Sequence, residues 1–324
     1  MRSLAARAVK RPATSPPRSP SGEARLTRLP INGEPQWLLI RGEPRDAPVI
    51  LFLHGGPGMP SMYLSRLWAG GLEREALLVQ WDRYGAGKSW VWQREAGRLR
   101  TSREVDDAIA LITHLQATCR TGPVIVLGHS YGAYLAVALA RRRPDLVRAL
   151  IAVSPMTVSH AAELVHQDVW LRGRAEAAAD RRLLARLDDA REWDRGPDVF
   201  RYGGGVVGLA SPFTLGALAL EAPEYSLMDL FRLASGIRDA HRHFVMDGPA
   251  LPLMDNAVHF GMPVHVVIGA QDRITSIDTV RPWFDALQAP EKTWTVLDHS
   301  AHLPFIEEPD QFATIIRGLV VQAA

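Results

Sequence analysis

The chain has 324 residues, of which 47 % are hydrophobic and 22 % are charged, a composition typical of a soluble globular protein with a sizeable core. The formal net charge of +2 provides no strong field that would predict nucleic acid or an anionic membrane as a partner. The single cysteine, Cys119, excludes an intramolecular disulfide and a cysteine-based metal site, and it is consistent with a cytoplasmic protein.

The first 24 residues are rich in Arg, Ser, Pro and Ala, and several prolines interrupt any helix that could form there. We expect a disordered leader at residues 1–24, although an Arg-rich segment without acids also resembles a transit peptide. The leader lacks the apolar centre of a secretory signal, and no apolar run in the chain approaches the roughly 20 residues of a membrane span.

Short apolar runs then alternate with helical patterns. The runs lie at residues 37–40, 49–55, 76–82, 124–130 and 149–155, and the helical patterns at 102–117 and 131–143. The apolar runs lack the polar alternation of half-exposed strands, which indicates strands buried on both faces. Alternating strands and helices predict an α/β fold with a mostly parallel sheet flanked by helices.

This rhythm breaks in a stretch of about ninety residues that is rich in Ala, Leu, Arg and acids. Its helical spacing predicts helices interrupted near Gly173, and the glycine-rich residues 202–208 are expected to form a flexible joint. Strand patterns resume at 264–270 and 294–300, and a helix is expected from about Asp310. The predicted organisation is a core formed by residues 25–155 and 254–324, with a helical cap inserted at 156–253.

Residues 128–132 read GHSYG, which fits the pattern G-x-S-x-G between an apolar strand and a helix. In that context the serine stands on a sharp turn, and the flanking glycines allow the strand and helix to approach closely. The turn lifts the hydroxyl above the sheet edge, beside a helix N-terminus that favours negative charge. We therefore predict Ser130 as a nucleophile.

Residues 54–58 read HGGPG and follow the strand at 49–53. A loop rich in glycine exposes backbone N–H groups, and a nucleophile elbow needs two such donors for the oxyanion. We predict the amides of Tyr131 and Gly56 as these donors. His54, at the end of the strand, is expected to brace the loop, and Asp82 and Arg83 are expected to form a structural hydrogen-bonded loop nearby.

The acid and the base should follow the serine in that order along the chain. The segment GAQDRIT (269–275) directly follows the apolar run VHVVI, so Asp272 should lie at the carboxyl end of a strand, where α/β folds place their sites. Two histidines compete for the base, because His299 is nearer the strand end and His302 lies deeper in the loop. Asp298 is a rival acid, but it is too close to His302 along the loop to orient it easily.

Three segments together resemble the proline iminopeptidase branch of the α/β hydrolases. They read HGGPG (54–58), WDRYGAGKS (81–89) and GHSYGA (128–133). The resemblance implies an α/β-hydrolase fold with a helical cap, and it favours His302, since members carry the pattern H-x-x-x-x-E-x-P there. It is strong over residues 35–155 and 262–312, and weak across the expected cap.

Members of this family hold the substrate's free amine with carboxylates of the cap, which implies Glu221 and Glu224 as substrate-binding residues, with Glu192 and Asp194 as further candidates. The cap segment departs from the usual family patterns, which leaves specificity for N-terminal proline open. Any of these carboxylates can equally be a solvated group on a helix face.

These residues predict a serine hydrolase that acts through an acyl-enzyme on a small-molecule or short-peptide substrate, without metal or cofactor. Ser130 attacks, His302 is the base, and Asp272 orients it. The leading hypothesis is an iminopeptidase-like aminopeptidase or amidase. The alternatives are an esterase or lactonase with the same triad, and a ligand receptor with an idle triad. Dehalogenases and epoxide hydrolases are excluded because they carry Asp at the elbow.

Overall fold

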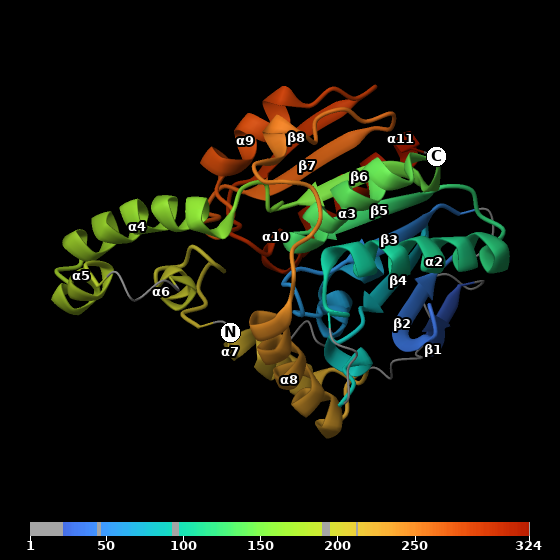
Figure 1. Ribbon diagram of the computed structural model, residues 1–324, viewed down its shortest axis with the longest axis horizontal. Coiled ribbons are helices and arrows are strands. Elements are labelled where there is room, and N and C mark those ends of the chain that lie inside the picture. Colours follow the sequence, from blue (N-terminus) through green and yellow to red (C-terminus); the bar gives the residue numbers. More distant parts are fainter. Residues whose placement is uncertain (1–21, 44–46, 93–96, 190–194, 212, 324) are drawn as a thin grey trace.

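The computed structural model describes residues 22–43, 47–92, 97–189, 195–211 and 213–323. Their strands form one eight-stranded sheet in the order β1-β2-β4-β3-β5-β6-β7-β8, antiparallel at the β1–β2 and β2–β4 pairs and parallel elsewhere (Figure 1). The strands are β1 (Glu23–Ile31), β2 (Glu34–Gly42), β3 (Val49–Leu53), β4 (Leu77–Asp82), β5 (Val124–His129), β6 (Val147–Val153), β7 (Val264–Gly269) and β8 (Lys292–Leu297).

Helices cover both faces of the sheet. One layer contains α2 (Thr101–Cys119), α3 (Tyr131–Arg142) and α9 (Ile277–Ala286), and the other contains α11 (Pro309–Ala323) with the short helices η1 (Met62–Leu67) and α10 (Pro304–Glu307). Alternate residues of each strand point to opposite layers, so a strand between two layers must be apolar throughout. In β3, for example, Leu51 joins the first core cluster and Phe52 the second. This arrangement confirms the predicted α/β architecture.

The region between β6 and β7 contains a series of helices. They are α4 (His160–Ala177), α5 (Arg181–Leu187), α6 (Gly196–Arg201), α7 (Phe213–Glu221) and α8 (Leu227–His243). In Figure 1, α4 to α6 extend away from the sheet on one side, while α7 and α8 lie on another side, near the segment that follows β4. The inserted segment thus occupies the part of the chain where a helical cap was expected.

The expected interruption near Gly173 was wrong, because α4 continues through this residue. A glycine inside a helix costs only about 1 kcal/mol, and Leu171 and Ala175 on either side of it are buried. The helix ends instead before Ala179, which has a positive φ of 51°. Asp180 then begins α5 by accepting a hydrogen bond from the Leu183 amide.

The start of the folded core differs from the prediction, and several predicted residues lie outside the described part of the chain. β1 begins at Glu23, so the folded core starts two residues before the expected boundary at 25. Residues 1–21 of the predicted leader lie outside the described residues, as do Glu192 and Asp194. Among the helices that the structure describes, none is long and apolar enough to span a membrane.

Candidate active site

Ser130 occupies the turn between β5 and α3. Its backbone adopts φ 55° and ψ −122°, a conformation that is uncommon and strained for a residue with a side chain. The turn is held by β6, because the Ser130 amide donates to the Val153 carbonyl (2.9 Å) and the Ser130 carbonyl accepts from the Met156 amide (3.2 Å). Ser130 is partly exposed although its neighbours His129 and Tyr131 are buried.

The flanking glycines are required by close packing. A β-carbon on Gly128 would collide with the backbone of Gly132 and Ala133, and one on Gly132 would collide with the carbonyls of Leu53 and His54. The first turn of α3 therefore lies directly against the end of β5 and the end of β3. This close strand–turn–helix packing is the geometry that the G-x-S-x-G pattern predicts.

Asp272 and His302 lie side by side, with Nδ1 of His302 2.9 Å from Oδ2 of Asp272. The other oxygen of the buried Asp272 accepts from the amides of Ile274 (2.8 Å) and Thr275 (3.0 Å). Burial opposes the charge of Asp272, but His302 and these amides outweigh it, so the pKa of Asp272 lies below its usual value. The carboxylate is thus charged and fixed where it can orient the imidazole.

The competing residues of the same loop point elsewhere. His299 is exposed, and its backbone amide donates to Glu308 (3.1 Å). Asp298 is also exposed, and its carbonyl accepts from Gln271 (3.3 Å). The structure therefore brings together Asp272 and His302, and it does not bring His299 or Asp298 to the buried pair.

Glu307 holds the loop that carries His302, a role that the sequence interpretation missed. Its carboxylate accepts from the amides of Ala301 (3.0 Å) and Leu303 (3.0 Å), which flank His302, and from the amide of Val207 (2.7 Å). Burial raises the pKa of Glu307, against the effect of these three hydrogen bonds. The signal was present in the sequence, since Glu307 is the acid of the H-x-x-x-x-E-x-P pattern.

The glycine-rich residues 202–208, which were expected to form a flexible joint, lie against the loops of the site. The Gly205 carbonyl accepts from the His302 amide (3.0 Å), and the Gly204 carbonyl accepts from the Arg273 amide (2.9 Å). Val206 is buried in the core cluster that also contains Leu303. A β-carbon on Gly204 would be 2.7 Å from the β-carbon of Arg273, so a glycine at this position allows close approach to the loop of Asp272.

The loop at 54–58 lies against the elbow. A β-carbon on Gly55 would be 3.3 Å from the β-carbon of Ser130 and 3.0 Å from Nδ1 of His129. Gly56, the predicted oxyanion donor, is the next residue and is partly exposed, as Ser130 is. Tyr131 is the first residue of α3, so its amide has no acceptor within the helix. The two predicted donors therefore come from segments that meet at Ser130.

A buried network supports this loop from behind. Arg83 donates to the His54 carbonyl (2.8 Å) and to Oε1 of Glu104 (3.1 Å), and Oε2 of Glu104 accepts from the hydroxyl of Tyr131 (2.9 Å). The pKa of Glu104 lies above its usual value, because the effect of burial outweighs the opposite effects of Arg83 and Tyr131. The network joins the two segments that carry the predicted oxyanion donors, and it fixes the peptide unit between His54 and Gly55.

The prediction of a structural loop around Asp82 is confirmed. Ser89 donates to the Asp82 carbonyl (2.5 Å), and Oδ2 of Asp82 accepts from the Lys88 amide (2.9 Å). His54 braces its own loop as expected, with Nδ1 2.8 Å from the Gly55 carbonyl. Burial and the nearby Arg83 hold the pKa of His54 well below its usual value, so it is neutral near pH 7.

The two carboxylates expected to bind substrate, Glu224 and Glu221, differ in burial. Glu224 is buried and pairs with Arg66 of η1, with Oε1 2.6 Å from Nε. Glu221 is exposed at the end of α7. Oε2 of Glu224 has no hydrogen-bond partner, but the carboxylate already has a cationic partner in Arg66. The role of Glu221 and Glu224 in substrate binding stays a prediction.

A different carboxylate of the inserted segment lies near the Asp272–His302 pair. Oε1 of Glu163, in the first turn of α4, accepts from the Thr279 hydroxyl (2.7 Å). Its Oε2 is shielded from solvent and has no hydrogen-bond partner. Burial raises the pKa of Glu163 to about 7. The charge of Asp272 also raises this pKa, and the charge of His302 lowers it. The sequence offered no signal for Glu163, which reads as an ordinary acid near a helix N-terminus.

Comparisons with known proteins identify the family of the chain. Residues 50–315 match the alpha/beta hydrolase family, and the chain belongs to this family. It is similar to the probable aminopeptidase YbaC of Bacillus subtilis (strain 168), with 26 % identity over 300 residues that cover 90 % of this chain and 94 % of the relative. The proline iminopeptidase of Heyndrickxia coagulans is 26 % identical over 284 residues, which cover 83 % of this chain and 88 % of that protein.

Among solved structures, the proline iminopeptidase of Mycobacterium smegmatis has the same fold, with a TM-score of 0.69. The similarity covers 92 % of this chain and 98 % of that one, at 18 % sequence identity. The predicted α/β-hydrolase fold and the resemblance to proline iminopeptidases are therefore confirmed.

Proposed function

We propose that this protein is a serine hydrolase that releases N-terminal residues from small peptides or amides through an acyl-enzyme. The observation that carries the proposal is the strained Ser130 at the β5–α3 turn together with the buried Asp272–His302 pair. This combination provides a nucleophile, a base and a group that orients the base.

In the proposed reaction, His302 removes the hydroxyl proton of Ser130 as the oxygen attacks the substrate carbonyl. Asp272 holds the imidazole in one tautomer and stabilises its positive charge. The amides of Gly56 and Tyr131 bind the oxyanion, an interaction typically worth about 3 kcal/mol for each donor. His302 then donates the proton to the leaving amine, and water hydrolyses the acyl-enzyme with the same base.

The preference for a free amine is supported by two observations. Relatives that span most of this chain are named as a probable aminopeptidase and a proline iminopeptidase. Glu163 also offers a buried carboxylate oxygen without a partner, close enough to His302 for the two charges to interact. An unpaired buried oxygen is costly, and an ammonium group would satisfy it. We therefore add Glu163 to Glu221 and Glu224 as a candidate anchor for the amine.

The second candidate function is hydrolysis of a small ester or lactone at the same serine. Glu224 is paired with Arg66, and Glu221 is exposed, which favours this alternative if Glu163 does not bind substrate. For either function we propose a cytoplasmic location, on the basis of the single cysteine.

The test uses fluorophosphonate labelling to establish the nucleophile, followed by a panel of aminoacyl anilides, their N-acylated counterparts and short acyl esters. We expect labelling and faster turnover of the free-amine anilides. Glu163→Gln should lower kcat/KM for free-amine substrates by roughly tenfold to a thousandfold, and leave N-acylated substrates and esters nearly unchanged. Equal losses on all substrates, or faster ester turnover in the native protein, would favour the esterase.

The pH dependence gives an independent measurement of the same anchor. Because burial raises the pKa of Glu163 to about 7, its charge is lost as the pH falls through 7. The ratio of kcat/KM for free-amine and N-acylated substrates should therefore fall below pH 7, while protonation of shared catalytic groups cancels in the ratio. In Glu163→Gln this acid limb should disappear. A ratio independent of pH in the native protein would exclude Glu163 as the anchor.

A further inference from the structure

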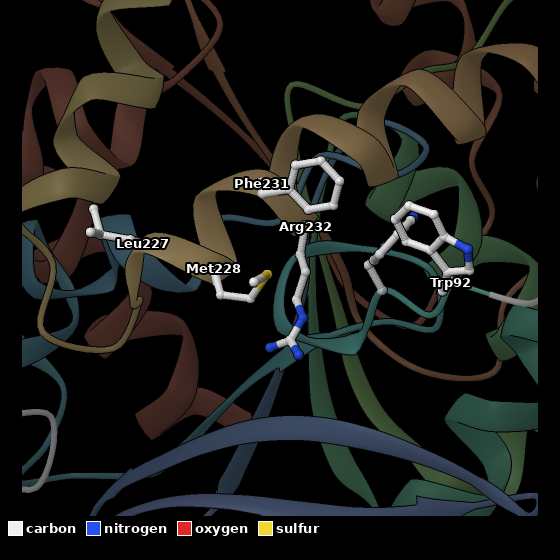
Figure 2. A pocket seen from close by; sticks show the side chains of 6 residues that line it. Trp92, Leu227, Met228, Phe231 and Arg232 are labelled. Atoms are coloured by element: carbon white, nitrogen blue, oxygen red, sulfur yellow. The ribbon is translucent and has the colours of Figure 1, made fainter.

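The outer face of α8 carries exposed apolar side chains beside the segment that follows β4. Trp92 is 76 % exposed and Leu227 81 %, and Met228 and Phe231 are also exposed. The rings of Trp92 and Phe231 stack, with centroids 6.3 Å apart and an interplanar angle of 20°. These side chains, drawn in Figure 2, line an open hollow together with Trp90 and Arg232. The hollow has a volume of about 690 Å³. Contiguous exposed apolar surface of this kind marks interaction sites.

The acids and the arginines of α8 differ in exposure. Both acids of the helix, Asp229 and Asp239, are buried. Asp229 pairs with Lys88 (2.7 Å) and also with Arg232 (2.8 Å). Asp239 accepts from the indole of Trp90 (2.7 Å), and Arg238 lies 3.6 Å from it. The three arginines, Arg232, Arg238 and Arg242, are partly or fully exposed above the two buried acids, so the outward face of α8 is apolar with an excess of basic side chains.

The apolar and basic side chains share one side of the helix. At about 100° per residue, Leu227, Phe231, Arg238 and Arg242 fall within about 60° of each other. The N-terminal half of this face is apolar, and the C-terminal half is basic. Aromatic and aliphatic side chains flanked by arginine are typical of helices that lie in the interface of a membrane.

We propose that this α8 surface, formed by Trp92, Leu227, Met228, Phe231, Arg238 and Arg242, docks on an anionic phospholipid surface. The apolar side chains would enter the interface, and the arginines would bind the lipid phosphates. A second copy of the chain fits the surface less well, because a symmetric contact would bring the arginines of both copies together. The excess of exposed arginines over exposed acids thus favours an anionic occupant.

The location of the surface gives docking a consequence for the candidate site. The inner face of α8 packs on the loop at 54–58, where a β-carbon on Gly58 would meet Ala240 and Gly236. One helix, about 10 Å across, therefore separates the proposed membrane contact from this loop. Docking would hold the hydrolase with its oxyanion loop close to the lipid surface, and the chain would bind as a peripheral protein.

The test is sedimentation of the full chain with vesicles of phosphatidylcholine alone and of phosphatidylcholine mixed with phosphatidylglycerol. We expect binding to the mixed vesicles and much weaker binding to the neutral ones, with a loss at high salt. Phe231→Ser should reduce partitioning by about tenfold. Replacement of Arg238 and Arg242 by Gln should reduce it by about 30-fold.

Matched controls separate the surface from general effects. Val169→Ser on α4 also removes an exposed apolar side chain, and Arg281→Gln on α9 removes an exposed arginine. Both should bind like the native chain, and unchanged melting temperatures would show that all variants are folded. Equal binding to neutral and mixed vesicles, binding that survives both sets of substitutions, or no binding would overturn the proposal. Self-association lost in Phe231→Ser without vesicle binding would assign the surface to a second copy.

Discussion

Buried acids near the proposed site differ between the core loops and the helices inserted between β6 and β7. In the core, both carboxylate oxygens of Asp272, Glu307 and Glu104 accept hydrogen bonds, and Glu307 binds the backbone amides on both sides of the proposed base. In the inserted segment, Glu163 and Glu224 each keep one carboxylate oxygen without a hydrogen-bond partner, but Glu224 is paired with Arg66. The three core acids therefore position other groups, whereas Glu163 retains capacity for a ligand.

The largest effect is expected at Ser130, the proposed nucleophile, where the core loops converge. Ser130→Ala should abolish fluorophosphonate labelling and reduce kcat by about 10⁴-fold or more, since the covalent route is removed. The melting temperature should not fall, because the strained turn is set by the backbone contacts to β6. Labelling that persists at another serine would contradict the assignment.

A loss of about 10³- to 10⁴-fold in kcat is expected for Asp272→Asn, with KM little changed. The amide would favour the wrong tautomer of His302 and could not stabilise its positive charge. The measurement is steady-state kinetics on the preferred substrate. A loss below tenfold would mean that another acid orients His302.

A smaller effect is expected at Glu307, which acts through the loop of His302. Glu307→Gln replaces one accepting oxygen by a donor that faces backbone N–H groups, so the loop should shift and kcat should fall by about 10- to 100-fold with KM nearly constant. Glu308→Gln is the matched control, because Glu308 binds Ser300 and the amide of His299 in the same loop. If both variants lose activity equally, Glu307 has no special role in positioning His302.

The sequence was sufficient for the core because its signals are local. The apolar run before Ser130 and the glycines around it lie within ten residues, and the strand before Asp272 adjoins it directly. The role of Glu307 was accessible only through the family pattern. The roles of Glu163 and of Gly205 depend on contacts with segments more than 90 residues away, at Thr279 and His302. No local pattern predicts which residue of an inserted helix will face such a partner.

The exposed surface of α8 illustrates the same limit. The net charge of +2 for the whole chain gave no reason to expect an anionic partner. The sequence of α8 gave none either, because its two acids nearly balance its three arginines. Folding buries the two acids against Lys88 and Trp90, while the arginines remain at the surface, two of them beside these acids. A helix that is balanced in sequence is therefore basic where it meets solvent.

Within the inserted segment, substitutions of Glu224 and Glu221 should differ in their effect on the free energy of unfolding. Glu224→Ala should lower the free energy of unfolding by about 3 kcal/mol, because it leaves the largely buried Arg66 without its carboxylate partner. Chemical denaturation measures this loss. A change below about 1 kcal/mol would mean that the ion pair contributes little, and Glu224 would then be free to exchange Arg66 for a substrate amine.

The smallest effect is expected for Glu221→Gln, which changes an exposed side chain at the end of α7. Its free energy of unfolding should remain within about 0.5 kcal/mol of the native value, as is usual for surface positions without special contacts. This stability makes the variant a sensitive probe of substrate binding, because any loss on free-amine substrates could not be attributed to damaged structure. If Glu163 is the anchor, Glu221→Gln should leave kcat/KM unchanged for both free-amine and N-acylated anilides. A selective loss on free-amine substrates would instead mean that Glu221 reaches the amine when substrate binds, and the carboxylate implied by the family resemblance would replace Glu163 in the proposed mechanism.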